Sequence, residues 1–253
     1  MKEYTIYPLK VGQFHGIEKS CLSYLTDAGT KLDAPVIMYL IKGDDTSIVV
    51  DTGCSEPELA EKYHRKTDQP DWMKPVNALR AHGVEPEDVT IVINTHLHWD
   101  HCYNNDKFPN AKIYVQRREM EFAAAPLPTQ HIYYESGKTG LTPPWVKTIT
   151  QYEIIEGDYP LMDGIDIIFT PGHTPGFQSV LVNTSGGRYM IASDCVGLLE
   201  NWNNTLYGSP VISGIHVDVE EYYRTLAKIR KLCDHVLPGH DEKVFEHTVY
   251  PHA

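Results

Sequence analysis

The segment THLHWDH, residues 95–101, places three histidines and one aspartate within seven positions. Imidazole nitrogens and carboxylate oxygens bind Zn²⁺ and related divalent metals in proteins. On an extended segment His96 and His98 lie on the same side. Asp100 and His101 follow on the turn, where they can approach a metal from a second direction. A histidine-rich surface loop is the simpler alternative. A metal site is the better interpretation only if further candidate ligands occur elsewhere in the chain.

Three residues of the same kind follow apolar stretches later in the chain. His173 lies in the rigid turn TPGHTPG, Asp194 follows RYMIAS, and His240 follows HVLPG. Strand ends that meet at one edge of a sheet would bring these residues beside the first group. The complete candidate set is His96, His98, Asp100, His101, His173, Asp194 and His240.

Five histidines and two aspartates are one ligand short of filling two four-coordinate metal sites. A bridging carboxylate counts twice, and a bridging water or hydroxide can supply the remainder. Imidazole and carboxylate without thiolate favour Zn²⁺, with Fe, Mn or Co as alternatives. Other histidines and the cysteines next to the candidate ligands are expected to have structural roles instead: His131, His216, His247, Cys102 and Cys195.

Composition narrows the function classes. A formal charge of −12 over 253 residues argues against a nucleic-acid binder. The basic clusters QRRE (116–119) and KIRK (228–231) are interpreted as solvated helix faces. No stretch approaches the ~18 apolar residues of a membrane helix, and the N-terminus lacks the apolar core of a signal peptide. Five scattered cysteines fit free thiols, so we expect a cytoplasmic protein.

Strand-like and helix-like stretches are interspersed along the chain. Apolar runs predict strands at 36–41, 47–50, 89–96, 111–116, 166–173, 178–194 and 235–241. Helical patterns follow at 56–66, where Ser55 is a candidate N-cap, and at 74–84, 117–125 and 219–232. Residues 126–150 have weak periodicity and predict a long, partly helical excursion. The arrangement indicates a mixed α/β or layered sandwich architecture.

Several of these motifs, in this order, resemble the metallo-β-lactamase superfamily. They are DTG (51–53), THLHWDH, TPGHTPG, SD (193–194) and PGHD (238–241), and their spacing is similar in particular to the N-acyl-homoserine-lactone lactonase branch. The resemblance runs from about Pro35 to the C-terminus. It implies one metallo-hydrolase domain over residues 1–253, an αββα sandwich of two mixed β-sheets with helices on the outer faces.

The resemblance also assigns roles to the candidate residues. It implies that His96, His98 and His173 hold one metal and that Asp100, His101 and His240 hold the second. Asp194 would bridge the two metals together with a hydroxide. Asp51 would orient ligands without binding metal itself.

The implied activity is hydrolysis of a lactone or related ester, possible targets including N-acyl-homoserine lactones, which would make the protein a quorum-quenching enzyme. Two divalent metals lower the pKa of a shared water enough to supply hydroxide, which attacks the ester carbonyl. Asp100 would carry the proton to the leaving alkoxide. No GxSxG motif of a serine hydrolase is present.

One position departs from the lactonase pattern. The lactonases carry a tyrosine three residues after the bridging aspartate, where this chain has Gly197. Either another residue replaces that tyrosine or the substrate differs. Segments 126–150 and 198–216 are rich in aromatic residues and are expected to line the pocket, with Tyr133, Tyr134, Trp202 and Tyr207 as candidate substrate-binding residues.

Other activities of the same fold stay open at this point. Hydrolysis of another cyclic ester, a small-ring amide or a glyoxalase II-like thioester would use the same ligands. A mononuclear-iron sulfur dioxygenase would leave Asp100 and His240 as non-ligands. A flavin-linked diiron oxidase would need a flavin domain, and a binding module without activity would be expected to have lost a ligand. We expect a small-molecule substrate as partner, and a homodimer as one form of assembly.

Overall fold

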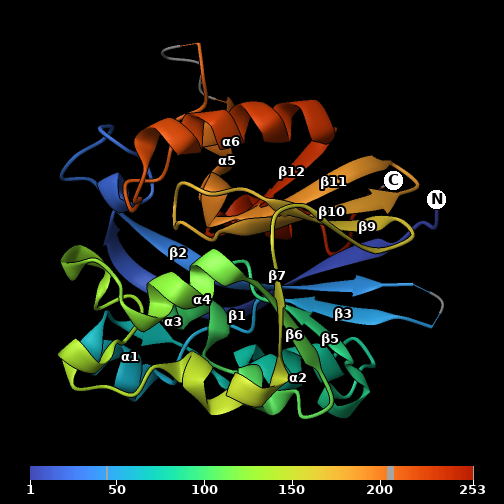
Figure 1. Cartoon of the computed structure of the whole chain (residues 1–253), viewed down its shortest axis with the longest axis horizontal. Helices are drawn as coiled ribbons and strands as arrows, with labels where there is room; N and C mark the ends of the chain where they lie inside the picture. The colour runs from blue at the N-terminus through green and yellow to red at the C-terminus, as the bar shows by residue number, and fades with distance from the viewer. Residues whose placement is uncertain (44, 204–207, 253) are drawn as a thin grey trace.

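The computed structural model describes residues 1–43, 45–203 and 208–252. Two β-sheets face each other, and helices cover their outer sides (Figure 1). The first sheet has the strand order β4-β1-β2-β3-β5-β6-β7 and the second has the order β12-β11-β10-β9-β8. Both sheets contain parallel and antiparallel pairs. The expected αββα sandwich of two mixed sheets is confirmed.

The elements have the following bounds. The first sheet contains β1 (Thr5–Glu18), β2 (Lys31–Lys42), β3 (Ser47–Val50), β4 (Thr67–Asp68), β5 (Ile91–Ile93), β6 (Lys112–Gln116) and β7 (Tyr152–Ile155). The second contains β8 (Tyr159–Met162), β9 (Ile165–Phe169), β10 (Gln178–Thr184), β11 (Gly187–Ser193) and β12 (His235–Pro238). The α-helices are α1 (Pro57–Tyr63), α2 (Pro75–Arg80), α3 (Trp99–Cys102), α4 (Arg117–Ala124), α5 (Leu199–Asn203) and α6 (Val219–Leu232). Short 3-10 helices are η1 (Lys19–Cys21), η2 (Asp71–Met73), η3 (Pro86–Asp88), η4 (Asn105–Lys107), η5 (Pro128–Gln130), η6 (Gly137–Thr139), η7 (Pro144–Gln151), η8 (Asp194–Val196) and η9 (Glu242–Glu246).

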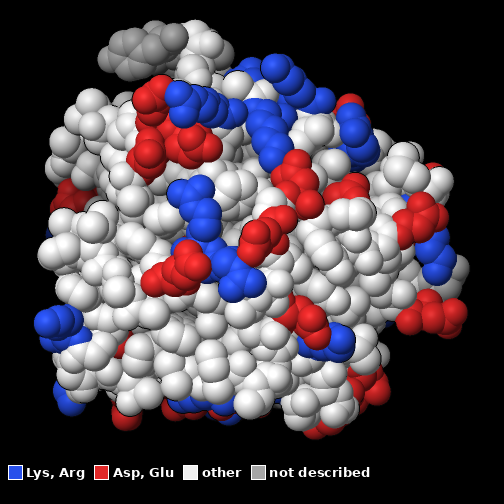
Figure 2. Space-filling view, viewed as in Figure 1, with Lys and Arg blue, Asp and Glu red and all other residues white. Residues whose placement is uncertain are grey.

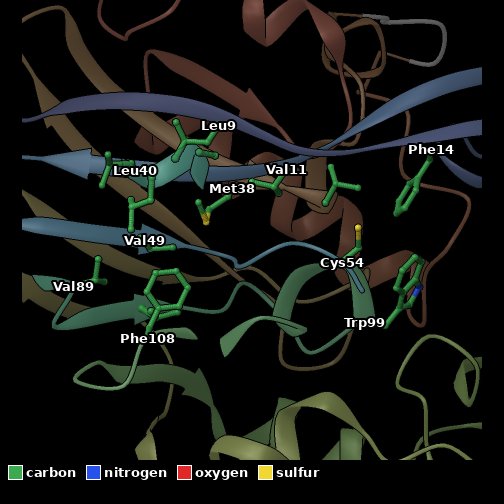
Figure 3. Packing of buried hydrophobic residues seen from close by; sticks show 14 of the residues in the cluster. Leu9, Val11, Phe14, Met38, Leu40, Val49, Cys54, Val89, Trp99 and Phe108 are labelled. Carbon is green, nitrogen blue, oxygen red and sulfur yellow. The ribbon is translucent and has the colours of Figure 1, made fainter. Parts of the chain in front are cut away.

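The first sheet is buried on both faces, which explains its nearly continuous apolar strands. In β3, Ile48 and Val50 join the cluster between the two sheets, whereas Val49 joins the cluster on the outer face. Figure 3 shows part of that outer cluster, with Phe14 of β1 and Trp99 of α3 near one end. Packing on both faces holds the strand ends in fixed positions.

Helix α6 covers the second sheet because one of its faces is apolar. Tyr222, Leu226 and Ile229 share that face and are buried, and each contributes roughly 2 kcal/mol on burial. Asp218 caps the helix by accepting a hydrogen bond from the Glu221 amide. The KIRK segment lies in this helix, and Figure 2 shows basic side chains interspersed with acidic ones on the face it presents.

Two local expectations need correction. Ser55 does not cap α1: Glu56 is the N-cap residue, no side-chain cap bond forms, and the Ser55 hydroxyl is buried without a partner among the described residues. The strand expected over 89–96 is only β5, Ile91–Ile93, because the chain leaves the sheet to place the histidines. Of the described helices, none is long and apolar enough to span a membrane.

Candidate dinuclear metal centre

The seven candidate ligands form two adjoining groups at the edge of the sandwich. His96, His98, His173 and Asp194 each offer a ligand atom within 4.8 Å of the others, and Asp100, His101 and His240 do the same. These residues come from the ends of β5, β11 and β12, from α3, and from the loop between β9 and β10. The prediction that strand ends bring them together agrees with this geometry.

Asp194 lies between the two groups. Its Oδ2 is 3.4 Å from His173 Nε2 and 3.9 Å from His96 Nε2. Its Oδ1 is 3.1 Å from His240 Nε2 and 3.3 Å from His101 Nε2. Each carboxylate oxygen therefore faces one group, which is the arrangement a bridging ligand requires.

Hydrogen bonds behind the histidines fix which nitrogen points inward. His173 Nδ1 lies 2.6 Å from the Ile215 carbonyl oxygen, and His240 Nδ1 lies 2.8 Å from that of Pro35. An Nδ1–H that donates to such an oxygen leaves the Nε2 lone pair free for a metal. His98 is turned the other way, since its Nδ1 lies 3.4 Å from His173 Nε2.

Asp51 organises the centre from behind. Its buried carboxylate lies 2.9 Å from His101 Nδ1 and accepts hydrogen bonds from the amide and hydroxyl of Thr95 and from the hydroxyl of Ser193. Asp51 adopts φ 58°, and Ser193 adopts φ 47°, so both residues hold left-handed backbone conformations. Asp51 thus joins the ends of β3, β5 and β11 through these hydrogen bonds.

The five ligand histidines fall into two groups, according to whether the folded protein lowers or raises their pKa. Burial lowers the pKa of His96 and His98 well below the ordinary value, with the neighbouring histidines adding to the effect, and burial also lowers the pKa of His173. Burial opposes charge on His101 and His240 as well, but the carboxylates of Asp194 and Asp100 outweigh it and raise their pKa. Burial thus favours the neutral imidazole of the first three, whereas the carboxylates beside His101 and His240 favour a positive charge at those positions, which a bound cation can supply.

The orphaned atoms of the centre test whether metals fit. His96 Nε2, His101 Nε2 and Asp194 Oδ1 are buried and have no hydrogen-bond partner among the described residues. Buried polar atoms without partners are costly, and here several of them converge between the two groups. Divalent cations would satisfy them, and nitrogen and carboxylate donors without thiolate suit Zn²⁺, Fe, Mn or Co.

Close backbone packing explains two of the glycines in the motifs. A Cβ at Gly239 would lie 2.5 Å from Asp194 Oδ1, and one at Gly172 would lie 2.5 Å from the Tyr222 Cα. Tyr222 in turn donates its hydroxyl to the Asp194 carbonyl oxygen at 2.8 Å. Helix α6 therefore supports both the Asp194 turn and the turn that carries His173.

Glu119 is a buried residue of the centre that the sequence interpretation missed, because QRRE was read as a solvated helix face. Arg117 and Arg118 are exposed, but Glu119 is fully buried. Its carboxylate accepts hydrogen bonds from the Leu97 amide at 3.0 Å, the Gly176 amide at 3.2 Å and the Thr174 hydroxyl at 2.6 Å. It links the two ligand-bearing turns. In the sequence, the small apolar Ala123 one helical turn later is the weak sign that this face points inward, and Ala123 is buried in the structure.

Two of the four candidate substrate-binding residues are placed away from the ligands' open side. Tyr134 is fully buried and donates its hydroxyl to Glu119 at 2.7 Å, so we do not propose that it binds substrate. Trp202 packs under Arg230, 4.8 Å from the guanidinium carbon, and does not line the cavity over the ligands. Tyr207 lies outside the described residues.

Tyr133 does line that cavity, with its ring centroid 5.2 Å from that of His98. Among the described residues, the wall around it contains residues that no sequence pattern indicated. The lining consists of Phe14, Ile17, Cys21, Leu22, Arg65, His98, Trp99, Asp100, Tyr133, Asp194, Ser213, Ile215 and His240.

Gly197 lies beside the second ligand group. Its carbonyl oxygen accepts a hydrogen bond from the His240 amide at 3.0 Å. A Cβ at this position would meet Leu22 Cδ2 at 3.7 Å, an ordinary contact. A side chain at position 197 would therefore extend toward Leu22 and the cavity wall.

An αββα sandwich with two adjoining His/Asp groups at its edge defines a metallo-hydrolase fold with a two-metal site. Residues 33–240 match the family model described as the metallo-beta-lactamase superfamily. The chain belongs to the metallo-β-lactamase superfamily.

Individual relatives point to one branch. The chain is 35% identical over 198 residues to an N-acyl homoserine lactonase of Bacillus sp, and the matched region covers 74% of each protein. It is 28% identical over 232 residues to the N-acyl homoserine lactonase AttM of Rhizobium radiobacter, 84% of each. A solved N-acyl homoserine lactone hydrolase, with the product N-hexanoyl-L-homoserine at its catalytic metal centre, superposes with a TM-score of 0.80 at 25% identity, covering 100% of this chain and 99% of that one. The resemblance inferred from the motifs is confirmed.

Proposed function

We propose that this protein is a metal-dependent hydrolase that opens the ring ester of a lactone, with N-acyl-homoserine lactones as the first substrates to test. The observation that carries the proposal is the position of Asp194, whose two oxygens face two complete groups of ligand atoms. The relatives named above are lactonases with the same fold. Together these support hydrolysis of an ester bond.

The residues fit two divalent metals. His96, His98, His173 and one oxygen of Asp194 would hold the first, and Asp100, His101, His240 and the other oxygen would hold the second. Such metals, when bound, polarise an ester carbonyl and make hydroxide available at neutral pH. Zn²⁺ is the metal that we propose, because all the ligand atoms are imidazole nitrogens or carboxylate oxygens.

Residues of the chain itself transfer the proton and limit the access of water. Asp100 lines the cavity, and its Oδ2 lies 3.9 Å from both His101 Nε2 and His240 Nε2. From there its carboxylate can accept the proton of the attacking water and deliver it to the alkoxide oxygen released when the ring C–O bond breaks. The products are a carboxylic acid and an alcohol on one opened chain, and Phe14, Ile17 and Leu22 keep other water away.

The geometry favours two metals over the single iron of a sulfur dioxygenase. In that alternative Asp100 and His240 would not be ligands, yet their ligand atoms converge with that of His101 within 4.8 Å. Thioester or small-ring amide hydrolysis would use the same centre and differ only in the cavity wall. The wall therefore decides between these substrates.

Other parts of the proposal rest on the sequence. We propose one metallo-hydrolase domain over residues 1–253 and a role in quorum quenching, which follows only if acyl-homoserine lactones are the substrates. The cytoplasm is the proposed location because the five cysteines are unpaired in the structure, as expected in a reducing compartment. Homodimer formation stays a prediction.

The first experiment is metal analysis of the purified protein, beside a pH-indicator assay on a panel of lactones. About two Zn or similar ions per chain, with acid released from at least one lactone, would support the proposal. One iron per chain without acid release would overturn it, and oxygen consumption with persulfide substrates would then be measured.

A further inference from the structure

Arg65 is a basic residue in the cavity wall with no assigned role. It follows helix α1, where its amide donates to the Ala60 carbonyl oxygen at 2.8 Å. Its guanidinium carbon lies 5.2 Å from the centroid of the Phe14 ring. The Phe14 ring in turn lies 6.1 Å from the ring of the ligand His240. Arg65 is thus separated from the metal centre by one aromatic side chain.

The guanidinium has no counter-charge in the part of the chain that the structure describes. Its Nε is buried and makes no hydrogen bond there. Three of the other arginines pair with carboxylates: Arg80 with Glu85, Arg117 with Glu156, and Arg224 with Glu220. Those arginines are exposed, whereas Arg65 is half-buried. Acidic residues outnumber basic ones by 34 to 22, so this chain has no shortage of partners.

Arg65 shares one cavity with the reaction site. Arg65, Tyr133 and Asp100 all line it. The ring of Tyr133 lies 5.2 Å from that of the ligand His98, so a substrate in this cavity can meet both the ligands and Arg65.

A half-buried guanidinium without a partner is costly, and stacking on one phenyl ring offsets only part of that cost. Its planar donors match a carboxylate in a two-bond arrangement, which a neutral carbonyl cannot complete. We propose that Arg65 binds a carboxylate on the substrate, so that the preferred lactone or ester carries a negative charge apart from the bond that is cleaved. This inference rests on the proposed hydrolase function and names the substrate class of that site.

The test compares two lactones that differ by one charge. N-succinyl-homoserine lactone ends in a carboxylate, and N-succinamoyl-homoserine lactone ends in a neutral amide of the same shape. We expect metal-loaded wild-type protein to prefer the charged lactone by about 10-fold or more in kcat/KM, mainly through KM. Arg65→Met should abolish the preference, and Arg65→Lys should keep part of it.

Arg118→Met is the matched control, because Arg118 is exposed and stacks on Phe169 with its guanidinium carbon 5.7 Å from the ring. It should leave the preference intact. Equal kcat/KM for the two lactones in wild type, or equal losses for both in Arg65→Met at unchanged metal content, would overturn the inference. If Arg65→Met does not fold, the wild-type preference and Arg65→Lys still decide.

Binding of the ring-opened products separates this inference from the proposed function. Calorimetric titration of the metal-loaded protein with N-succinyl-homoserine and N-succinamoyl-homoserine requires no turnover. If no lactone of the panel is hydrolysed, these two included, the proposed function fails, but about 10-fold tighter binding of the succinyl compound that disappears in Arg65→Met still supports a carboxylate site. Equal binding of the two compounds would overturn it.

Discussion

The floor and the wall of the cavity are built in different ways. The floor consists of the seven candidate ligands with Asp51 and Glu119. Nearly all of it is buried, at strand ends and in the turns and helices next to them. The wall consists of Phe14, Ile17, Cys21, Leu22, Arg65, Trp99, Tyr133, Ser213 and Ile215. The floor is cross-linked by buried hydrogen bonds, whereas the wall comes from the end of β1 and from loops and short helical turns. Bond cleavage and substrate choice are thus placed on separate parts of the molecule.

This separation explains how one fold can serve many substrates. The floor needs fixed ligand distances, so it is held by Asp51 on one side and Glu119 on the other. The wall needs only to match a substrate, and its segments can change without moving a ligand. Changes in the floor should therefore affect metal binding and every substrate alike, whereas changes in the wall should affect substrates selectively.

His101→Ala should have the largest effect. It removes one ligand of the second group and one partner of Asp51. Metal content should fall from about two ions to about one, and turnover should fall by more than about 100-fold, since even residues behind a ligand contribute 10–100-fold. Metal analysis and kinetics on the best lactone measure this, with His131→Ala as control. Full metal content and full rate in His101→Ala would show that the ligand assignment is wrong.

Glu119→Gln tests whether the floor depends on its buried support. The glutamine amide would point N–H groups at donors that now reach the carboxylate, such as the Tyr134 and Thr174 hydroxyls. We expect the free energy of unfolding to fall by about 2–4 kcal/mol and metal to be held less tightly. Urea denaturation measures the first effect, and competition with a chelator measures the second.

Glu121→Gln in the same helix is the control, because Glu121 is exposed and its change should stay within about 0.5 kcal/mol of wild type. If Glu119→Gln is as stable as this control, then Glu119 does not support the floor of the cavity.

The sequence predicted the floor of the cavity better than its wall. Asp194 directly follows an apolar strand and His96 comes three residues after one, so the apolar pattern and the residue type locate them together. Leu22 lies in a segment without periodicity, and Arg65 lies at the end of a helical pattern that gives no sign of a site. Only the packing of η1 and α1 against the sheet edge brings them to the cavity. Glu119 was missed because burial of a carboxylate depends on donors from Leu97 and Thr174, which lie far away in sequence.

Gly197→Tyr tests a position that lies between the ligand His240 of the floor and Leu22 of the wall. Gly197 has φ −61° and ψ −40°, which a tyrosine adopts without strain, and a Cβ meets only Leu22 within ordinary contact distance. We expect kcat/KM for acyl-homoserine lactones to change by roughly 5-fold, the value of about one net hydrogen bond, with metal content unchanged. Gly197→Phe separates the hydroxyl from the ring. Unaltered kinetics in both variants would mean that position 197 does not reach the scissile ester.

His15→Gln should have the smallest effect and should remove a pH-dependent contribution to the stability of the wall. His15 lies on β1 next to Phe14, and its ring nitrogens lie 2.9 Å from Asp33 Oδ2 and 2.8 Å from Asp68 Oδ2. Hydrogen bonds to Asp33 and Asp68 raise the pKa of His15 above 6.5. The charged imidazole thus ties the strand that supplies Phe14 to β2 and β4.

Because the folded-state pKa is raised, this stabilisation is fully present below about pH 6.5 and is lost as pH rises through the higher folded-state value. The aspartates are more than half exposed, so solvent screening limits the contribution to about 1 kcal/mol or less. Urea denaturation of wild type and His15→Gln should therefore differ more near about pH 5.5 than near about pH 9. Metal content should be the same in both proteins, because the floor does not contact His15. A stability difference that is constant across this range would show that the His15 charge does not hold the wall strand in place.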